Sequence, residues 1–225
     1  MTGIVTALES EAKPILELLE IQQQFEIAGK KCFKGTINQY QVCLIISDIG
    51  KVNAASATQS LISRFPEVDK VINFGVAGAV NPSLNLCDIC VVEKAIQYDF
   101  DVTAIDDVPV GFIQNLKQQF LYSDKKMYGK LMSFFHKTVT AATADRFSFS
   151  APDSEFITSL GGALRDMELG AIYQVCALND IPAAAVKSIS DTAEGNPAEE
   201  FAQNLEKATY CYQPYIERII KELNE

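Results

Sequence analysis

The stretch from Val68 to Gly78, which reads VDKVINFGVAG, is the segment that most restricts the fold. Its first half, residues 68–73, is largely apolar and has the composition of a buried strand, and this run stops at the glycines Gly75 and Gly78. A strand that leads into glycines is typical of a parallel sheet whose carboxyl edge opens onto a ligand. The stretch therefore predicts a central parallel strand beside a binding crevice.

The segments on either side of this strand alternate between strand-like and helix-like patterns. Further strands are predicted at residues 3–7, 32–36, 41–46, 88–93, 138–143 and 182–189. Helices are predicted at residues 9–19, 52–64, 156–160 and 167–178, and from about 198 to the end with a break at Pro214. Residues 99–122 are expected to form a functional or interface loop. Residues 1–225 are thus predicted to be a single domain, a three-layer α/β/α sandwich around a central mixed sheet.

The composition excludes several classes of partner. The chain of 225 residues has 19 Lys and Arg against 29 Asp and Glu, a formal net charge of −10, and no basic run. Nucleic acid and anionic membranes would be repelled by such a surface. No apolar run approaches the roughly 20 residues that span a bilayer, and residues 1–8 lack the basic region of a signal peptide. We therefore expect a cytoplasmic protein.

The six cysteines are expected to be free thiols, because most of them lie inside apolar segments. Cys87 and Cys90 form a C-x-x-C motif, but the flanking residues 86–92 read as a strand, where positions three apart point to opposite faces. No second cysteine pair is nearby, and His136 is the single histidine, so no metal is expected. The glycines of residues 75–78 do not form a nucleotide fingerprint, and no cofactor is expected.

Several acidic residues stand where a predicted strand gives way to a loop or helix. Glu11 follows the first strand, Asp166 and Glu168 stand at a predicted helix start, and Asp191 follows the strand at 182–189. The carboxyl ends of parallel strands meet at one edge, so these side chains could converge on a crevice. Each has a structural alternative, because acids also favour the first turn of a helix or cap it.

These acids lie in three of seven segments that together resemble the 5′-methylthioadenosine/S-adenosylhomocysteine nucleosidases of the purine nucleoside phosphorylase superfamily. The segments occur in the family's order, with compatible spacing. They are GIVTALESE (3–11), IGKVNAA (49–55), INFGVAG (72–78), YDFDVTA (98–104), ADRF (144–147), DME (166–168) and SISD (188–191). The resemblance implies a nucleoside phosphorylase-like fold and hydrolysis of a purine nucleoside to adenine and a thioribose product.

The resemblance also implies roles for three carboxylates. Cleavage of a purine N-glycosidic bond builds positive charge on the ribose and negative charge on the base. Asp191 matches the family's acid, which protonates base nitrogen N7 and therefore needs a raised pKa. Glu11 matches the carboxylate that holds the attacking water, and Glu168 matches the acceptor of the ribose hydroxyls.

Other residues of the pocket are carried over from the same resemblance. Met167 would pack against the ribose, Phe147 would stack on the base, and backbone groups at Ser148 would read the base edge. Ile49 would line the pocket for the 5′ substituent. Ile105 would come from the long loop of a neighbouring subunit, which implies a homodimer.

Two pocket positions depart from the family pattern. Val76 stands where many members have a serine near the attacking water, and Lys187 stands where an arginine usually supports the acid and the water. A lysine keeps the charge but loses the planar guanidinium fork. Both residues are still expected to take part in substrate binding.

Three alternative functions remain open. One is a nucleosidase for another purine nucleoside, such as futalosine or inosine. The second is a phosphorylase of the same superfamily, although residues 9–13 carry acids that would repel phosphate, and no arginine precedes Arg64 or lies between Arg64 and Arg146. The third is a nucleoside-binding protein without activity.

Overall fold

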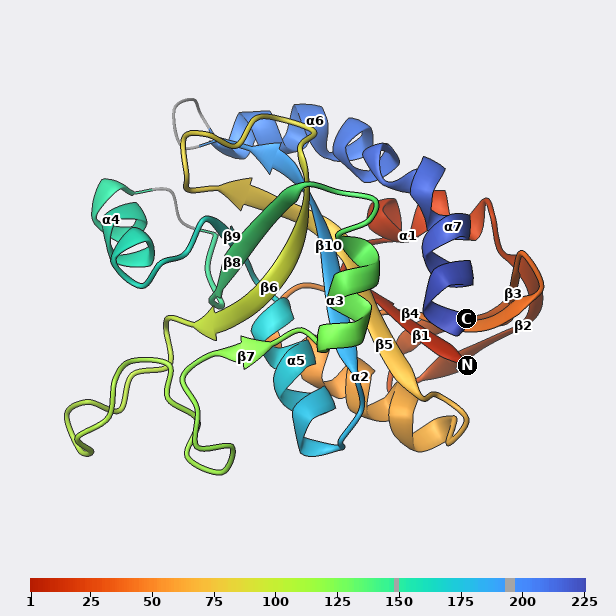
Figure 1. Ribbon diagram of the computed structural model, residues 1–225, viewed down its shortest axis with the longest axis horizontal. Helices are drawn as coiled ribbons and strands as arrows, with labels where there is room; N and C mark the ends of the chain where they lie inside the picture. The colour runs from red at the N-terminus through yellow and green to blue at the C-terminus, as the bar shows by residue number, and fades with distance from the viewer. Residues whose placement is uncertain (148–149, 193–196) are drawn as a thin grey trace.

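The computed structural model describes residues 1–147, 150–192 and 197–225. Within these ranges the strands join into one mixed sheet that runs through the middle of the molecule (Figure 1). The strands are β1 (Thr2–Thr6), β2 (Glu20–Ile27), β3 (Lys30–Ile37), β4 (Tyr40–Ile46), β5 (Lys70–Ala79), β6 (Ile89–Gln97), β7 (Leu121–Tyr122), β8 (Lys137–Thr143), β9 (Leu164–Asp166) and β10 (Ala183–Asp191).

Strand β5 lies at the centre of this sheet, as its sequence predicts. It pairs in parallel with β1 on one side and with β10 on the other. All of its residues after Lys70 are buried. One part of the prediction was wrong, because the strand does not stop at Gly75 but continues through Gly78 to Ala79. The two glycines mark places where side chains from other elements come close to the strand.

The sheet closes on itself beyond β5. Strand β10 pairs antiparallel with β6, β6 and β8 are parallel, β8 and β9 are parallel, and β9 returns antiparallel to β5. On the other side of β5 the order continues β1, β4, β3 and β2 as an open sheet. The closure brings the carboxyl ends of β5, β9 and β10 to one place, because β9 meets β5 at the pair Arg165 and Gly78.

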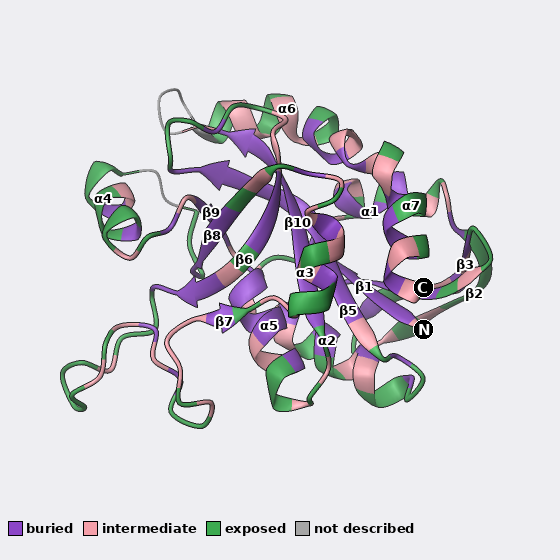
Figure 2. Ribbon diagram, viewed as in Figure 1, coloured by how far each residue is buried: buried purple, intermediate pink, exposed green. Residues whose placement is uncertain are grey.

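Helices cover both faces of the sheet and make the three predicted layers (Figure 1). They are α1 (Glu9–Leu16), α2 (Lys51–Arg64), α3 (Lys125–Leu131), α4 (Ala151–Ser159), α5 (Leu169–Leu178), α6 (Pro197–Cys211) and α7 (Gln213–Asn224). Helices α2 and α5 bury Leu61 and Ile172 in one apolar core, whereas α1, α3 and α7 bury Ile15, Leu131 and Ile216 in the other. In Figure 2 the central strands β1, β5 and β10 are almost wholly buried, whereas β2 at the edge of the sheet is exposed.

Several elements differ from the predictions. Strand β2, helix α3 and the short strand β9 were not predicted, and β9 takes the place where a helix start was expected, so α5 begins only at Leu169. Asp166 ends β9, and Asp191 belongs to β10 instead of following it. Cys87 was expected in a strand but lies before it. Its φ is +67°, and β6 starts at Ile89. Strand β2 is polar and exposed, so its sequence lacks the apolar alternation of a half-buried strand.

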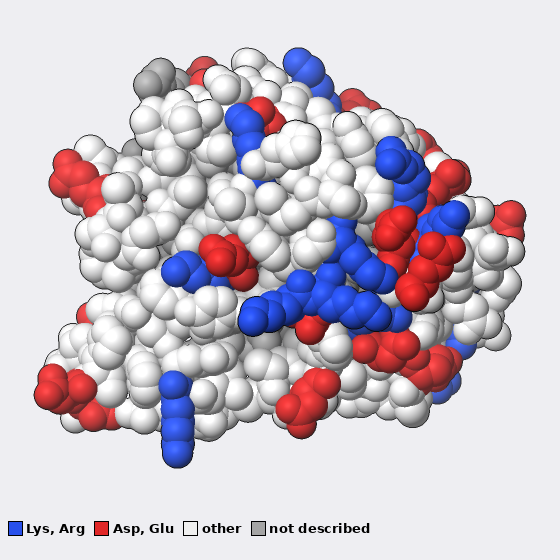
Figure 3. Space-filling view, viewed as in Figure 1, with Lys and Arg blue, Asp and Glu red and all other residues white. Residues whose placement is uncertain are grey.

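The remaining features concern the surface and the loops. Residues 99–122 form a long loop, interrupted by a bridge between Ile113 and Gln118 and ending at β7. The helix break near Pro214 is confirmed, since α6 ends at Cys211 and α7 begins at Gln213. On the face in Figure 3, a short band of Lys and Arg is bordered by Asp and Glu. Within the described ranges no helix is long and apolar enough to cross a membrane.

Candidate functional site

A cavity of about 420 Å³ opens where β1, β5, β9 and β10 end. Most of the residues predicted to form a site line it, together with several that were not predicted. The lining residues are Ala7, Leu8, Glu11, Ile49, Val76, Ala77, Gly78, Arg146, Phe147, Arg165, Asp166, Met167, Glu168, Ser190, Asp191, Ala198 and Phe201. The cavity therefore combines apolar walls with four carboxylates and two guanidinium groups.

Glu11 is held in a fixed position by backbone donors. Its Oε2 accepts the amide N–H groups of Ala7 at 2.8 Å and Leu8 at 3.0 Å, and its Oε1 accepts that of Val76 at 2.8 Å. The hydroxyl of Tyr212 also donates to the Glu11 carbonyl oxygen at 3.0 Å. These hydrogen bonds fix the orientation of the carboxyl group in the cavity. Gly75 makes room for the group, because a Cβ there would lie 2.8 Å from Oε1.

Lys187 and Asp166 form a buried ion pair beside Glu168. The distance from Lys187 Nζ to Asp166 Oδ2 is 2.9 Å, and the two side chains are 2 % and 1 % exposed. Asp166 also accepts the Thr143 hydroxyl at 2.6 Å and the Leu169 amide at 2.9 Å. The charges of the neighbouring carboxylates outweigh burial and raise the pKa of Lys187. Lys187 does not line the cavity, so it can act on a ligand only through its neighbours.

Glu168 stands at the end of the loop between β9 and α5. Its Oε1 accepts the Gly50 amide at 2.9 Å, which ties it to the start of α2. Burial, and after it the charge of Asp166, raises the pKa of Glu168 to about 8, although Lys187 and the Gly50 N–H act in the opposite direction. The protonation of Glu168 is therefore coupled to the charges of Asp166 and Lys187 beside it.

Asp191 lies at the opposite end of the carboxylate group, on β10. Its Oδ1 accepts the Ser190 hydroxyl at 2.8 Å, whereas its Oδ2 has no hydrogen-bond partner among the described residues. Burial raises the pKa of Asp191, and the Ser190 hydrogen bond and the charge of Arg165 partly counteract this. A buried carboxyl with a raised pKa and an unpaired oxygen can donate a proton to a bound molecule.

Apolar side chains form the walls around these acids. Phe147 is half exposed and its ring lies 5.7 Å from that of Phe201, edge to face. Met167 and Val76 also line the cavity, and Ile49 stands at its rim with 49 % of its surface exposed. Such walls suit the flat face of an aromatic ligand.

Besides Lys187, two predicted site residues are not among those that line the cavity. Ile105 is 87 % exposed in the long loop and does not line the cavity of its own chain. Ser148 lies outside the described residues. Among the described residues no group of three or more His, Cys, Asp or Glu could hold a metal ion.

Sequence reasoning missed Arg146, Arg165 and Phe201. Arg146 pairs with Asp153 and lies over the Tyr98 ring. Arg165 directly precedes the Asp-Met-Glu segment, and recognising β9 as a strand would have marked it as a residue at the same sheet edge. Phe201 lies on α6, beyond the last matching segment, and nothing in its surroundings in the sequence identifies it.

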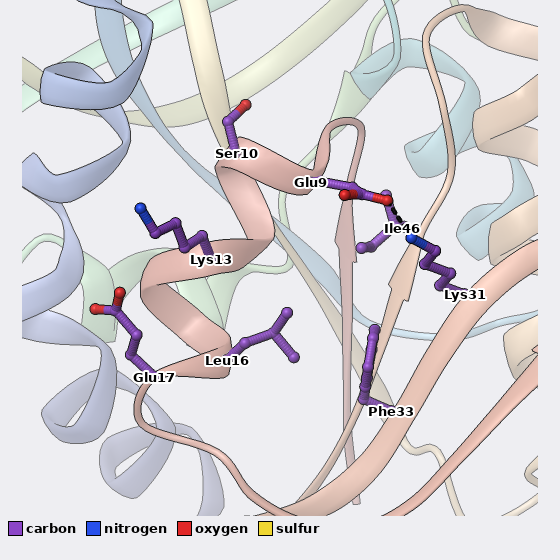
Figure 4. Close-up of a pocket in the computed structure, with 8 residues that line it drawn as sticks. All are labelled: Glu9, Ser10, Lys13, Leu16, Glu17, Lys31, Phe33 and Ile46. Atoms are coloured by element: carbon purple, nitrogen blue, oxygen red, sulfur yellow. Dashed lines mark hydrogen bonds and ion pairs between the residues drawn. The ribbon is translucent and has the colours of Figure 1, made fainter.

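A second hollow, of about 470 Å³, lies on the other side of α1 (Figure 4). Its charged groups are already paired: Lys31 with Glu9, and Lys13 with Glu206 at 3.2 Å. Glu17 accepts the Tyr210 hydroxyl at 2.5 Å. None of the residues predicted to carry chemistry lines this hollow, so the candidate site is the cavity at the strand ends.

Comparison with known proteins gives consistent matches over the whole chain. The family model described as phosphorylase superfamily matches residues 2–221. A 5′-methylthioadenosine/S-adenosylhomocysteine nucleosidase of Anoxybacillus flavithermus is 30 % identical over 231 residues, covering 99 % of each chain. An aminodeoxyfutalosine nucleosidase of Helicobacter pylori is 29 % identical over 229 residues, covering 98 % of each. The crystal structure of a mutant Helicobacter pylori nucleosidase with 5′-methylthioadenosine in its active site superimposes with a TM-score of 0.91 and 28 % identity, covering 98 % of both chains.

The raised pKa of Glu168 predicts a pH dependence of stability. In the unfolded chain the carboxyl ionises near its ordinary pKa of 4.5, whereas in the fold its pKa is about 8. The folded state therefore holds the proton more tightly, and stability is lost as pH rises from 4.5 to 8, by at most about 1.4 kcal/mol per pH unit. Glu168→Gln should flatten this slope, measured as the free energy of unfolding in urea at pH 5, 6.5 and 8.

The exposed Glu155→Gln variant is the matched control and should keep the wild-type slope. An unchanged slope in Glu168→Gln would show that Glu168 is already ionised at neutral pH in the empty site.

Proposed function

The chain belongs to the phosphorylase superfamily, and on this premise we propose that it hydrolyses the N-glycosidic bond of 5′-methylthioadenosine and S-adenosylhomocysteine. The products are adenine and the corresponding thioribose. The observation that carries the proposal is the meeting of Glu11, Glu168 and Asp191 in one cavity, each with a different hydrogen-bond environment.

Asp191 is the general acid of this proposal. The leaving base gains negative charge as the bond breaks, and a proton at N7 neutralises it. The unpaired Oδ2 is the atom that would deliver the proton, and the raised pKa keeps a proton available there. Ser190 fixes the orientation of the carboxyl by donating to its other oxygen.

Glu11 is the carboxylate that orients the attacking water. Its two oxygens accept three backbone N–H groups, so its position is set by β1, α1 and β5 together. An ionised carboxylate offers about four lone-pair sites, which leaves capacity for one water molecule. The water then attacks the anomeric carbon from the side of the ribose opposite to the base, and Glu11 takes its proton.

Glu168 accepts the ribose hydroxyls. Its raised pKa favours the protonated form in the empty site, whereas the positive charge that develops on the sugar favours the ionised form, whose negative charge then stabilises the transition state. Lys187 acts through this residue and Asp166: it is a positioning residue that keeps three buried carboxylates close together. Lysine stands here in place of the family's arginine, and its single ammonium group pairs with Asp166. The ammonium also lies near Glu11, because a Cβ at Gly75 would be 2.8 Å from Glu11 Oε1 and 3.3 Å from Lys187 Nζ.

The walls complete the nucleoside pocket. Phe147 and Phe201 are aromatic faces for the base, and Met167, which lines the cavity with Asp166 and Glu168, can pack on the ribose. Val76 forms an apolar surface next to the amide that binds Glu11. Ile49 stands at the exposed rim, where the 5′ substituent leaves the cavity.

Water is a better nucleophile here than phosphate. The ribose end of the cavity carries Glu11, Asp166 and Glu168, and the cation nearest to them, Lys187, is already paired. Arg146 pairs with Asp153, and Arg165 lies beside Asp191 at the base end. A phosphate dianion would therefore meet carboxylates at the position from which it must attack.

A second candidate is the same hydrolysis with a larger 5′ group. The relative from Helicobacter pylori is named an aminodeoxyfutalosine nucleosidase. The half-exposed position of Ile49 leaves the 5′ end open to solvent, which would admit a bulkier substituent.

Assembly and location complete the proposal. We take residues 1–225 as one catalytic domain, and we propose a homodimer in which Ile105 of each subunit closes the 5′ end of the other subunit's cavity. A two-fold axis would use one loop twice in this way, and Ile105, which is 87 % exposed, is accessible to a second subunit. The six free cysteines fit the reducing cytoplasm, where we place the protein.

The direct test of this function is an assay on methylthioadenosine, adenosylhomocysteine, inosine and futalosine, with and without phosphate. We expect adenine from the first two at rates that phosphate does not raise. Release of a sugar phosphate would identify a phosphorylase, and intact substrates with tight binding would identify a binding protein.

Asp191→Asn should lower kcat by about 10²–10⁴-fold, because an amide cannot protonate N7. Binding of adenine should remain, since the side chain keeps its shape. The control is Asp180→Asn, an exposed aspartate at positive φ, where asparagine is tolerated. More than a tenth of the wild-type rate in Asp191→Asn would refute its assignment as the acid.

Glu11→Gln should be similarly inactive but should trap intact nucleoside, because it removes the base that activates water and leaves the ribose and base contacts in place. The exposed Glu9→Gln variant on the same helix is the control. Equilibrium binding of methylthioadenosine, followed by recovery of the unchanged compound, is the measurement. Normal turnover, or complete loss of binding in a folded variant, would contradict the role.

Ile105→Asp should raise KM for methylthioadenosine more than for adenosine and should weaken the dimer. The charge would enter the apolar 5′ end of the neighbouring cavity, whereas acid and base are untouched. Light scattering gives the mass, with Ile21→Asp on β2 as an exposed apolar control. An active wild-type monomer would show that the interface is not needed.

A further inference from the structure

Arg165 lines the cavity beside Asp191, the residue proposed to meet N7 of the base. Only 8 % of its side chain is exposed, and neither Nη1 nor Nη2 has a hydrogen-bond partner within the described residues. The nearest carboxylate oxygen is Asp191 Oδ2, which is 3.8 Å from Nη2 and is unpaired too. Buried polar groups are rarely left without partners, so both atoms point to a ligand that supplies them.

The backbone of β5 at Gly78 allows Arg165 and Asp191 to lie side by side. Arg165 pairs with Gly78 across β9 and β5. A Cβ at position 78 would lie 2.6 Å from Asp191 Oδ2 and 3.0 Å from Arg165 Nε, so a residue other than glycine would push the pair apart. The absent side chain of Gly78 is what allows both groups to face the same part of the cavity.

The chemistry of the pair is that of two neighbouring donors. A guanidinium has only donors, and Asp191 is a donor when it carries the proton that it delivers to N7. On a purine, the group next to N7 along the same edge is the substituent on C6. In a 6-oxopurine both positions are acceptors, whereas in adenine the C6 amino group is a donor.

We propose that Arg165 reads the C6 substituent of the base and extends the substrates of this enzyme to 6-oxopurine nucleosides. The side chain donates to the carbonyl oxygen on C6 while Asp191 donates to N7. This inference rests on the proposed function, because it takes Asp191 as the group that meets N7. It makes Arg165 a specificity-determining residue that the sequence analysis did not identify.

A purely structural role for Arg165 would have a different signature. If the guanidinium only balanced the charge of Asp191, its removal would change the rate on every purine nucleoside by the same factor. Recognition of the C6 position changes the ratio between two substrates that differ only at C6.

The experiment compares 5′-methylthioinosine with 5′-methylthioadenosine in the wild type, Arg165→Met and Arg165→Gln. Arg165→Met should lower the ratio of kcat/KM for methylthioinosine to kcat/KM for methylthioadenosine by about tenfold or more. Arg165→Gln, whose amide oxygen can accept from the C6 amino group, should shift the ratio further toward the adenine substrate. Arg64→Met, on the exposed end of α2, should leave the ratio unchanged.

Calorimetric binding of hypoxanthine and adenine provides a readout that needs no turnover. The wild type should bind hypoxanthine, and Arg165→Met should lose about tenfold of that affinity relative to adenine. One outcome is that the wild type cleaves methylthioadenosine while the variants keep its ratio of kcat/KM between the two nucleosides and its ratio of affinity between hypoxanthine and adenine. In that case the Arg165 proposal is wrong and the proposed function stands. If the wild type cleaves neither nucleoside, the proposed function fails, and the binding ratio still decides the role of Arg165.

Discussion

Four carboxylates are buried around one cavity, and their mutual repulsion is the constraint on which the rest of the structure depends. Glu11, Asp166, Glu168 and Asp191 are each at most 8 % exposed. Buried charges of one sign are costly unless they are paired, hydrogen-bonded or protonated. The protein uses all three means: backbone N–H groups hold Glu11, Lys187 pairs with Asp166, and raised pKa values favour the protonated forms of Glu168 and Asp191.

The closed part of the sheet makes this arrangement possible. Because β5 pairs with β1, β9 and β10, the strand ends that carry the acids meet at one edge. Gly75 and Gly78 in β5 leave space for Glu11 on one side and for Asp191 with Arg165 on the other. The cavity thus has the close ion pair of Lys187 and Asp166 near Glu168 and the longer contact of 3.8 Å between Arg165 and Asp191 near Gly78. The pairing of the strands therefore determines which charged groups meet in the cavity.

Much of this could be predicted from sequence, for identifiable reasons. The apolar run before Gly75 predicted the central strand, and the acids at strand ends predicted a shared edge, where the structure places them. What could not be predicted involves contacts between distant segments. Strand β9 is three residues long and is defined by its partners, so Asp166 was assigned to a helix start. Lys187 was expected to touch the ligand, but its place beneath Asp166 follows from the pairing of β10. Arg165 was missed for the same reason, because its place at the sheet edge depends on the pairing of β9 with β5 at Gly78.

In the proposed reaction, buried carboxylates direct water, and not phosphate, to the ribose. The most direct measurement is cleavage of methylthioadenosine in water labelled with heavy oxygen and containing excess phosphate, with mass analysis of the sugar. The account predicts methylthioribose with one labelled oxygen, together with free adenine. Methylthioribose 1-phosphate, or an unlabelled sugar, would contradict it.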